Sequence, residues 1–207
     1  MLEASETVIV IDDDPQVRKA LGSLFRSVGI GASLYGSVSE FLKHGRSEGP
    51  TCMVLDVRLP GKSGLDFQRD LSDAGLHMPI IFITGHGDIP MSVEAIKGGA
   101  IAFLTKPFRD QDLLNAVQSG LKRDRAQHAE DKAAAQLHER FQSLTQRERE
   151  VMARVVTGLP NKTIADEIGV TEITVKVHRG NVMRKMAAAS LPDLVLMAEK
   201  LKAYTNV

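Results

Sequence analysis

The sequence contains no tryptophan, few aromatic residues and only one cysteine. A single cysteine excludes an intrachain disulfide, and Cys52 begins the apolar run 52–55. We therefore interpret it as a small buried residue and expect a reducing compartment. The chain has no run of about 18 apolar residues, and its acidic start lacks the basic and apolar parts of a signal peptide. We therefore expect a cytoplasmic protein with no membrane partner.

The chain also lacks an excess of charge of either sign, because 26 basic residues balance 26 acidic ones. This balance hides an asymmetry between the two ends. Residues 1–121 contain 11 basic and 15 acidic side chains and carry a net charge of −4, whereas residues 144–207 contain 10 and 7 and carry +3. The first part is therefore suited to cations, and the last part to polyanions.

Apolar runs and helical patterns alternate from residue 7 to about residue 121. Four runs are typical of buried strands and cover residues 7–11, 52–55, 80–83 and 101–104. Helical patterns cover residues 15–28, 37–44, 64–75, 90–98 and the segment from residue 110 onward. Strict alternation of five strands with five helices predicts an α/β domain with a doubly wound, five-stranded parallel sheet in the flavodoxin-like order.

The segment from Asp110 to about Arg140 has no strand pattern, and no helix breaker follows Gly120. It is rich in residues that favour helices, and thirty or so residues in one helix would span roughly 45 Å. We therefore expect a linker helix over residues 122–141, between a first domain over residues 6–121 and an all-α domain over residues 142–207.

The second domain is expected to contain four short helices and no strand. Thr145 and Glu148 form a capping-box pattern at the start of its first helix. Asn161 is expected to cap the second helix, and Thr171 opens the third. Only residues 169–171 separate the second helix from the third, which is the tight connection of a helix-turn-helix motif.

Polar side chains follow four of the predicted strands, at the sheet edge where doubly wound folds bind ligands. Asp12 and Asp13 follow the first strand, and Asp56 follows the run 52–55 directly. Thr84 and Lys106 follow the last two runs. Taken singly, they have ordinary explanations as solvated acids at a helix start, a strand-end hydroxyl and a surface lysine. Converging carboxylates repel one another unless a hard cation lies between them, and Mg²⁺ favours such oxygen ligands.

Taken together, these five side chains supply the parts needed to move a phosphoryl group. The cation and the amine of Lys106 neutralise phosphoryl oxygens, and the hydroxyl of Thr84 donates a hydrogen bond to one of them. The carboxylate of Asp56 acts as the nucleophile. The combination predicts a Mg²⁺-dependent site of phosphoryl transfer.

The third helix of the second domain has a buried stripe and an exposed face. Its stripe consists of apolar residues at positions i, i+7 and i+11, namely Val175, Val182 and Met186. At about 100° per residue, the opposite face carries Lys176, Val177, Gly180 and Arg184. A charged helix face is usually only solvated, but the tight preceding turn and the net positive charge favour a recognition helix in the major groove of DNA.

These two motif sets, in this order, resemble a known family. Residues 6–121 resemble the receiver domain of a two-component response regulator, and residues 142–204 resemble a DNA-binding domain of the NarL/LuxR type. The arrangement is most similar to that of FixJ-like regulators. The resemblance implies that a sensor histidine kinase donates a phosphoryl group, with Mg²⁺ as cofactor and Mn²⁺ as a substitute.

The resemblance also implies the consequences of phosphorylation. It implies a homodimer, double-stranded promoter DNA as the ligand, activation of transcription and RNA polymerase as a further partner. The chain is not expected to be an enzyme, apart from catalysing its own phosphorylation and dephosphorylation.

Within the first domain, the resemblance assigns roles to individual residues. Asp56 matches the phosphoacceptor. The implied metal ligands are Asp12, Asp13, Asp56 and the backbone carbonyl of Arg58. Lys106 matches the family's lysine, Thr84 the switch hydroxyl, and Phe103 the aromatic side chain that swings inward on activation. Lys106 and Pro107 match a peptide bond that is cis in the family.

In the second domain, residues 174–178 match the segment that enters the major groove. Lys176 and Val177 match base contacts, with the amine suited to guanine and the valine to a thymine methyl group. Gly180 stands where some relatives carry a lysine. Phosphate contacts, which position a domain without reading sequence, are expected from Arg179, Arg184, Lys185 and Lys162.

Three other functions fit parts of the pattern. Asp12 and Asp14 have the spacing of the acids of a haloacid-dehalogenase-like phosphatase, but Gln16 stands where that family carries Thr or Val. Asp14 before Pro15 is better explained as a helix cap. Because three acids follow one another, however, a shift of the match by one position would make Asp13 and Asp14 the metal ligands in place of Asp12 and Asp13. A nucleotide- or flavin-binding domain would need a glycine-rich phosphate loop, which the sequence lacks. A receiver-like module that is never phosphorylated would not need all five pocket residues.

Overall fold

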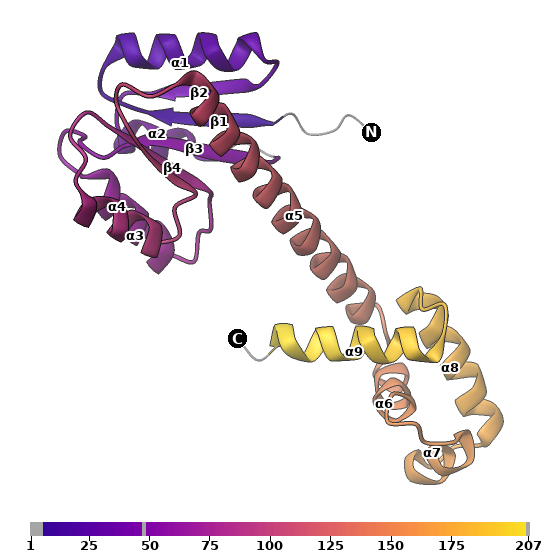
Figure 1. The fold of residues 1–207 in the computed structure, drawn as a ribbon. Helices are drawn as coiled ribbons and strands as arrows, with labels where there is room; N and C mark the ends of the chain where they lie inside the picture. The colour runs from indigo at the N-terminus through magenta and orange to yellow at the C-terminus, as the bar shows by residue number, and fades with distance from the viewer. Residues whose placement is uncertain (1–5, 47–48, 206–207) are drawn as a thin grey trace. The chain divides into compact units, whose positions relative to one another are not determined.

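The structure, a computed structural model, describes residues 6–46 and 49–205 (Figure 1). Residues 1–5 of the acidic N-terminal segment and residues 206–207 of the predicted second domain lie outside the described residues. The chain forms two compact units, residues 1–128 and residues 129–207. Within the described ranges, no helix combines the length and the apolar character needed to cross a membrane.

The first unit is built on a five-stranded parallel sheet. Its strands are β1 (Thr7–Ile11), β2 (Gly31–Tyr35), β3 (Thr51–Asp56), β4 (Ile80–Thr84) and β5 (Ala102–Thr105). They lie in the order β2-β1-β3-β4-β5, and every neighbouring pair is parallel. The predicted doubly wound, flavodoxin-like sheet is therefore confirmed.

Helices cover both faces of this sheet. One face is covered by α2 (Val38–His44), α3 (Gly64–Asp73) and α4 (Ile89–Lys97), and the other by α1 (Pro15–Ser27) and the first part of α5 (Asp110–Gln142) (Figure 1). Because successive side chains of a strand point to opposite faces, β1 contributes to both cores. Ile9 and Ile11 join the core beneath α2, α3 and α4. Val8 and Val10 join the core beneath α1 and α5.

Helix α5 is continuous from Asp110 to Gln142, so the predicted long helix is confirmed. It approaches β3 closely at Gly120. A Cβ atom on Gly120 would lie 2.5 Å from the sulfur of Cys52 and 3.3 Å from its Cβ. Cys52 is fully buried, and this burial, together with the charge of Asp124, raises the pKa of its thiol to about 12. The cysteine is therefore an inert packing residue at this contact, as predicted.

The contact between Gly120 and Cys52 gives the first testable prediction. Gly120→Ala should destabilise the first unit by about 1–3 kcal/mol, because the added methyl group overlaps the buried sulfur. Adding Cys52→Ala should recover most of this loss in thermal unfolding of the full chain. Gly180→Ala is the matched control, since a Cβ there would meet nothing within 4 Å and should stabilise its helix slightly. Equal effects of the two glycine replacements would contradict this explanation.

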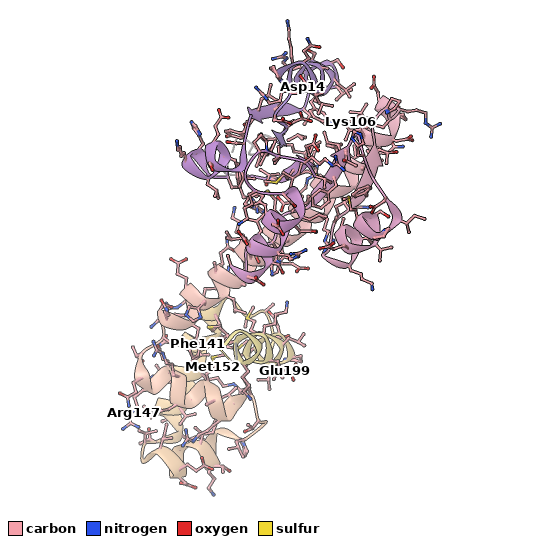
Figure 2. The ribbon with its side chains drawn as sticks, turned by 90° about the vertical axis from the view of Figure 1, so that its left-hand side faces the viewer. Asp14, Lys106, Phe141, Arg147, Met152 and Glu199 are labelled. Carbon is pink, nitrogen blue, oxygen red and sulfur yellow. The ribbon has the colours of Figure 1, made fainter. Side chains whose placement is uncertain are left out.

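The second unit is all-α. It contains the end of α5 and the helices α6 (Gln146–Val155), α7 (Asn161–Ile168), α8 (Glu172–Met186) and α9 (Leu191–Thr205). Their buried residues form one core, against which Phe141 packs and to which Met152 belongs (Figure 2). The predicted helix-turn-helix is confirmed: Gly169 ends α7 in the left-handed conformation, with φ 68°, and Thr171 caps α8.

One predicted cap is wrong. The residue before α7 is Pro160, which makes no side-chain capping bond, and Asn161 is already inside the helix. The side chain of Asn161 instead accepts a hydrogen bond from Arg179 of α8 at 3.2 Å. The capping rule predicts that the side chain of Asn161 bonds a backbone N–H at the start of α7. In the structure this side chain bonds Arg179 of α8, so a contact between two helices replaces the cap.

Candidate functional site

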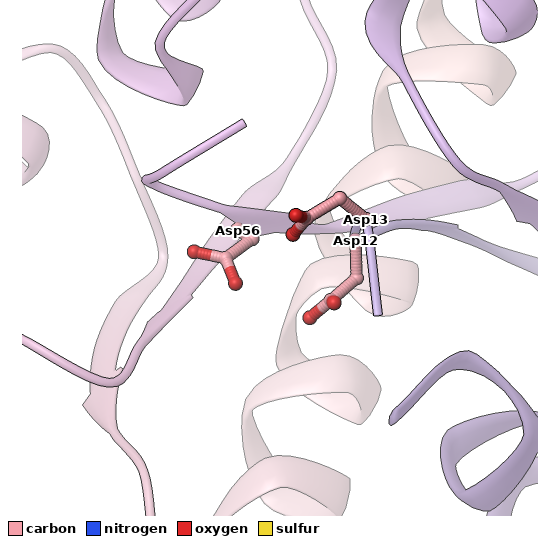
Figure 3. Close-up of side chains that lie close together, drawn as sticks. All are labelled: Asp12, Asp13 and Asp56. Atoms are coloured by element: carbon pink, nitrogen blue, oxygen red, sulfur yellow. The ribbon is translucent and has the colours of Figure 1, made fainter. Parts of the chain in front are cut away.

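Three carboxyl groups converge at the carboxyl edge of the sheet. Asp12 and Asp13 follow β1, and Asp56 ends β3, which is its hydrogen-bonded neighbour. Oxygen atoms of the three side chains lie within 4.8 Å of one another (Figure 3). Asp12 and Asp56 are buried, with exposed fractions of 0% and 7%, and Asp13 is exposed. The sheet thus presents two buried acids and one solvent-facing acid to the same small volume.

The third acid of the run has a different role. Asp14 accepts a hydrogen bond from the backbone N–H of Gln16 at 2.7 Å and so caps α1, as predicted. The backbone N–H of Asp14 in turn donates to Asp12 at 2.9 Å. Arg18 donates to the carbonyl oxygen of Asp12 at 2.6 Å and fixes the loop from the other side. These bonds favour Asp12 and Asp13 over Asp14 as the ligands of a cation.

Lys106 links the two buried acids. Its amine donates to Asp12 at 2.7 Å and to Asp56 at 2.8 Å, and the peptide bond between Lys106 and Pro107 is cis, as the resemblance implied. Burial lowers the pKa of the Lys106 ammonium, but the hydrogen bonds to both acids outweigh burial and hold this pKa above its usual value. At Asp12, burial dominates and raises the pKa of the carboxyl group despite Lys106. The amine is therefore cationic at neutral pH and offsets the repulsion between the acids.

Asp56 has a second fixed partner. The backbone N–H of Arg58 donates to the other carboxylate oxygen of Asp56 at 2.9 Å. Gly64, at the start of α3, also packs against this strand end, because a Cβ on it would lie 2.4 Å from the carbonyl oxygen of Asp56. The phosphoacceptor candidate is thus held in one orientation with an oxygen facing Lys106. The backbone N–H of Arg58 therefore contacts Asp56 directly, while the implied role of its carbonyl as a metal ligand stays a prediction.

Thr84 and Phe103 lie on neighbouring strands of the same edge. Thr84 is fully buried, and its hydroxyl accepts a hydrogen bond from the backbone N–H of His86 at 3.2 Å. Phe103 is partly buried, with its ring 6.3 Å from that of Phe82. A Cβ on Gly87 would lie 2.8 Å from the Phe103 ring and 3.1 Å from the methyl group of Thr84. Glycine at position 87 therefore makes room for both predicted switch residues.

The donor set of this pocket fits a hard divalent cation. Its closely spaced groups are carboxylate oxygens, which match the preference of Mg²⁺ for oxygen ligands. The exposed position of Asp13 leaves solvent access for the water ligands that Mg²⁺ retains. A cation there would neutralise phosphoryl oxygens next to Asp56.

The predicted DNA-contacting residues divide into two groups. The first group is exposed and consists of Lys162, Lys176, Val177 and Arg184. Val177 has 58% of its surface exposed. Arg184 donates to its helix neighbour Asn181, at 3.2 Å. These side chains are available to a ligand that approaches α8.

The second group is engaged within the unit. Arg179 is partly buried and donates to Asn161. Lys185 donates to Glu148 at 2.6 Å and to the carbonyl oxygen of Ser143 at 3.2 Å, and its side chain is 29% exposed. The predicted phosphate contacts of Arg179 and Lys185 would require each of them to share or leave these partners.

The ion pair between Glu148 and Lys185 gives a pH-dependent prediction. Burial raises the pKa of Glu148, but the bonds from Lys185 and Thr145 outweigh burial and hold this pKa below its usual value. A depressed carboxyl pKa stabilises the fold above the unfolded-state pKa, and the contribution is lost as pH falls through the folded-state value. Lys185→Ala should destabilise the second unit by about 2–3 kcal/mol at pH 7. Urea unfolding at several pH values should show this loss shrinking in acid, and a loss that is constant with pH would contradict the prediction.

A buried charged group on the far side of the first unit was not predicted from the sequence. Asp124 of α5 is 2% exposed, and its carboxylate accepts hydrogen bonds from Arg46 at 2.5 Å and from the backbone N–H of Thr51 at 2.7 Å. His128 lies 3.4 Å from the same oxygen. We call these four residues the Asp124 cluster. A signal was present, because Asp124 continues the buried stripe formed by Leu113, Val117 and Leu121.

Each of the two units matches a known protein family. Residues 8–118 match the response regulator receiver domain, and residues 142–198 match the luxR family of bacterial regulatory proteins. These two matches cover most of the chain and do not favour the phosphatase or the nucleotide-binding alternatives.

Individual relatives agree over nearly the full length. Nodulation protein W of Bradyrhizobium diazoefficiens is 52% identical over 96% of this chain and 88% of its own. The transcriptional regulatory protein FixJ of Azorhizobium caulinodans is 47% identical over 92% of this chain and 90% of its own. A solved structure of the response regulator StyR is 47% identical, with a TM-score of 0.88 over 95% of this chain and 100% of its own. The chain therefore belongs to the FixJ-like response regulators, which control transcription in response to phosphorylation through a receiver domain joined to a LuxR-type DNA-binding domain.

Proposed function

We propose that Asp56 accepts a phosphoryl group from the phosphohistidine of a sensor histidine kinase. The observation that carries the proposal is the pair of hydrogen bonds that the Lys106 amine donates. They join it to the buried carboxylates of Asp12 and Asp56. A carboxylate oxygen of Asp56 attacks phosphorus, the bond between phosphorus and the histidine nitrogen breaks, and an acyl phosphate forms. The reaction needs no external base to activate the nucleophile, because a carboxylate, unlike a hydroxyl, attacks without losing a proton.

The pocket residues neutralise the charge that this transfer brings. Asp12, Asp13, Asp56 and the carbonyl of Arg58 would hold Mg²⁺, or Mn²⁺ in its place. When bound, the ion neutralises phosphoryl oxygens and orients them. Lys106 is close enough to exchange its carboxylate partner for a phosphoryl oxygen. The same residues support the chain's part in its own dephosphorylation, in which water replaces the Asp56 oxygen at phosphorus.

Phosphorylation adds about −1.5 to −2 charge at Asp56. The hydroxyl of Thr84, which accepts a bond from the His86 N–H in this structure, can rotate and donate to the new oxygens. The space that Thr84 vacates lies next to Gly87 and the Phe103 ring, so Phe103 turns inward. This movement repacks β5 against α4, and the pair forms a two-state element.

The exposed face of α4 supports a homodimer of the phosphorylated chain. Ile89, Val93 and Ile96 occur at i, i+4 and i+7 on α4, and their exposed fractions are 79%, 45% and 49%. They form an apolar stripe on a surface helix, directly on the element that the switch repacks. A second copy of the chain that covers this stripe couples phosphorylation to dimerisation.

A charge in the α4 stripe should prevent the dimer without affecting the pocket. Val93→Glu should remain monomeric with beryllofluoride and Mg²⁺ in sedimentation experiments, because a carboxylate would be buried in an apolar contact. Its phosphorylation by acetyl phosphate should stay normal. Leu42→Glu on α2, where Leu42 is 61% exposed, is the matched control and should dimerise like the native chain. Dimers of Val93→Glu would exclude this face.

The second unit supports binding to double-stranded promoter DNA. With α8 in the major groove, Lys176 and Val177 face base edges, and Lys162 and Arg184 reach phosphates. Arg179 and Lys185 would add phosphate contacts by sharing their present partners. The dimer would place two such units on one promoter and activate transcription together with RNA polymerase, in the cytoplasm.

One experiment tests the whole proposal. Purified protein is measured with Mg²⁺, with and without acetyl phosphate or beryllofluoride, for sedimentation mass and for affinity to promoter fragments. The expected result is a dimer with tighter DNA binding after activation. Unchanged mass and affinity would reject the phosphorylation switch and leave a DNA-binding protein whose receiver has another role.

A further inference from the structure

The exposed face of α8 carries two large apolar side chains. Ile173 and Val177 have exposed fractions of 77% and 58%. Because residues four apart on a helix are neighbours on one face, the two side chains are adjacent. The buried residues Val175, Val182 and Met186 lie on the opposite side of α8. Ile173 and Val177 therefore contribute little to the core of their own unit.

Gly180 continues this face beyond Val177. It is exposed, and a Cβ on it would meet nothing within 4 Å, so packing within the unit does not require a glycine. We call Ile173, Val177 and Gly180 the apolar strip. The strip spans about 10 Å along the helix, which corresponds to about three base-pair steps. Because Gly180 has no side chain, nothing projects from that end of the strip. A flat surface can therefore approach both Ile173 and Val177.

The two threonine hydroxyls at the start of α8 are already in use, while Glu172 beside them is an exposed acid. The hydroxyls of Thr171 and Thr174 lie 2.8 Å apart, and Thr171 also caps the helix. Lys176, which is exposed beside Val177, supplies a cation on the same side of the helix. The face thus combines a positive charge with an apolar surface of small area.

We propose that the apolar strip reads thymine methyl groups, with Ile173 as a specificity-determining residue that acts beside Lys176 and Val177. This proposal rests on the proposed placement of α8 in the major groove. The thymine methyl is the apolar group that base pairs present in that groove. Ile173 and Val177 are about 6 Å apart along the helix, or nearly two base-pair steps. The preferred site therefore contains two thymines within three consecutive base pairs.

The test compares thymine with deoxyuridine, which pairs identically but lacks the methyl group. Preferred duplexes are selected from a random library with the full-length protein and beryllofluoride, and each thymine is then replaced singly. The native chain should lose about fourfold in affinity at each contacted thymine. Ile173→Ala should lose this discrimination at one thymine, and Val177→Ala at the other. Ile173→Val should retain most of it.

Lys176→Ala is the control that separates this inference from the proposed DNA-binding role. It should bind more weakly and still prefer thymine to deoxyuridine at both positions. Ile173→Ala that retains the native ratios at every thymine would overturn the inference while leaving DNA binding intact. If Ile173→Ala retained the native thymine-to-deoxyuridine ratios but formed less dimer, the apolar strip would be a contact between protein chains and not a contact with DNA. A native chain that selects no sequence would reject the placement of α8 itself. Circular dichroism should confirm that each variant is folded.

Discussion

Asp56→Asn should abolish the response to phosphodonors completely. The carboxamide cannot form the acyl phosphate, while its size and its bond from the Arg58 N–H are kept. Allosteric coupling energies are typically about 1–3 kcal/mol, or roughly 5- to 150-fold in affinity. In the native chain we expect an increase of this size in promoter affinity on phosphorylation. In Asp56→Asn, the ratio of affinities with and without acetyl phosphate should be about 1, as measured by fluorescence anisotropy on a promoter fragment.

Two variants make this result specific to the pocket. Asp66→Asn removes an exposed acid at the start of α3 and should respond like the native chain. Asp13→Asn should retain Asp56 as the acceptor but require more Mg²⁺ for the same response, because Asp13 is the proposed solvent-facing ligand. An undiminished response of Asp56→Asn to acetyl phosphate would place the acceptor elsewhere. A native chain without any response would instead reject the switch.

The sequence is sufficient to predict the sheet where its strands are buried. β1, β3 and β4 are covered on both faces, so apart from polar residues at their ends they are apolar and stand out as runs. The alternation implied a fifth strand but gave no position for it. β2 contains Gly31–Tyr35 at the edge of the sheet, and most of its side chains are only half-buried. A half-exposed strand does not need an apolar run, so periodicity cannot locate it.

The pocket was predictable for a similar reason. Once the strands are parallel, the groups that follow them must meet at one edge, and Lys106 indeed contacts Asp12 and Asp56. The partner of the Thr84 hydroxyl was not predictable from the sequence, because a hydroxyl accepts or donates according to its surroundings. In this structure its partner is the N–H of His86 in the following turn.

Charged pairs between distant segments were not predictable. Glu148 was recognised as half of a capping box with Thr145, which the structure confirms. Lys185, the partner of this buried carboxylate, is 37 positions away and was assigned to DNA. Arg46 and Asp124 are 78 positions apart. Local patterns contain no information on such pairs, although an acid on an otherwise apolar helix stripe indicates that a partner is needed.

Removal of Asp124 should cause the largest loss of stability that we expect from one substitution. Asp124→Ala leaves the guanidinium of Arg46 and the N–H of Thr51 without their acceptor. Removing one member of a buried ion pair typically costs about 3–5 kcal/mol. Asp124→Asn should cost less, since its amide oxygen can still accept from Thr51. Glu130→Ala, at an exposed position of the same helix, should change stability by less than about 0.5 kcal/mol.

The location of the Asp124 cluster determines how this loss should be measured. Thr51 begins β3, the strand that ends at Asp56, while Asp124 lies in the segment predicted as the linker helix. Loss of the cluster should therefore accelerate hydrogen exchange at the start of β3 and in α5 before it affects α6–α9. A double-mutant cycle with Arg46→Ala should give a coupling energy above about 1 kcal/mol, because the two side chains are in direct contact. Additive effects of the two substitutions, with β3 exchange unchanged, would show that Asp124 is a surface acid in solution and does not hold α5 against the sheet.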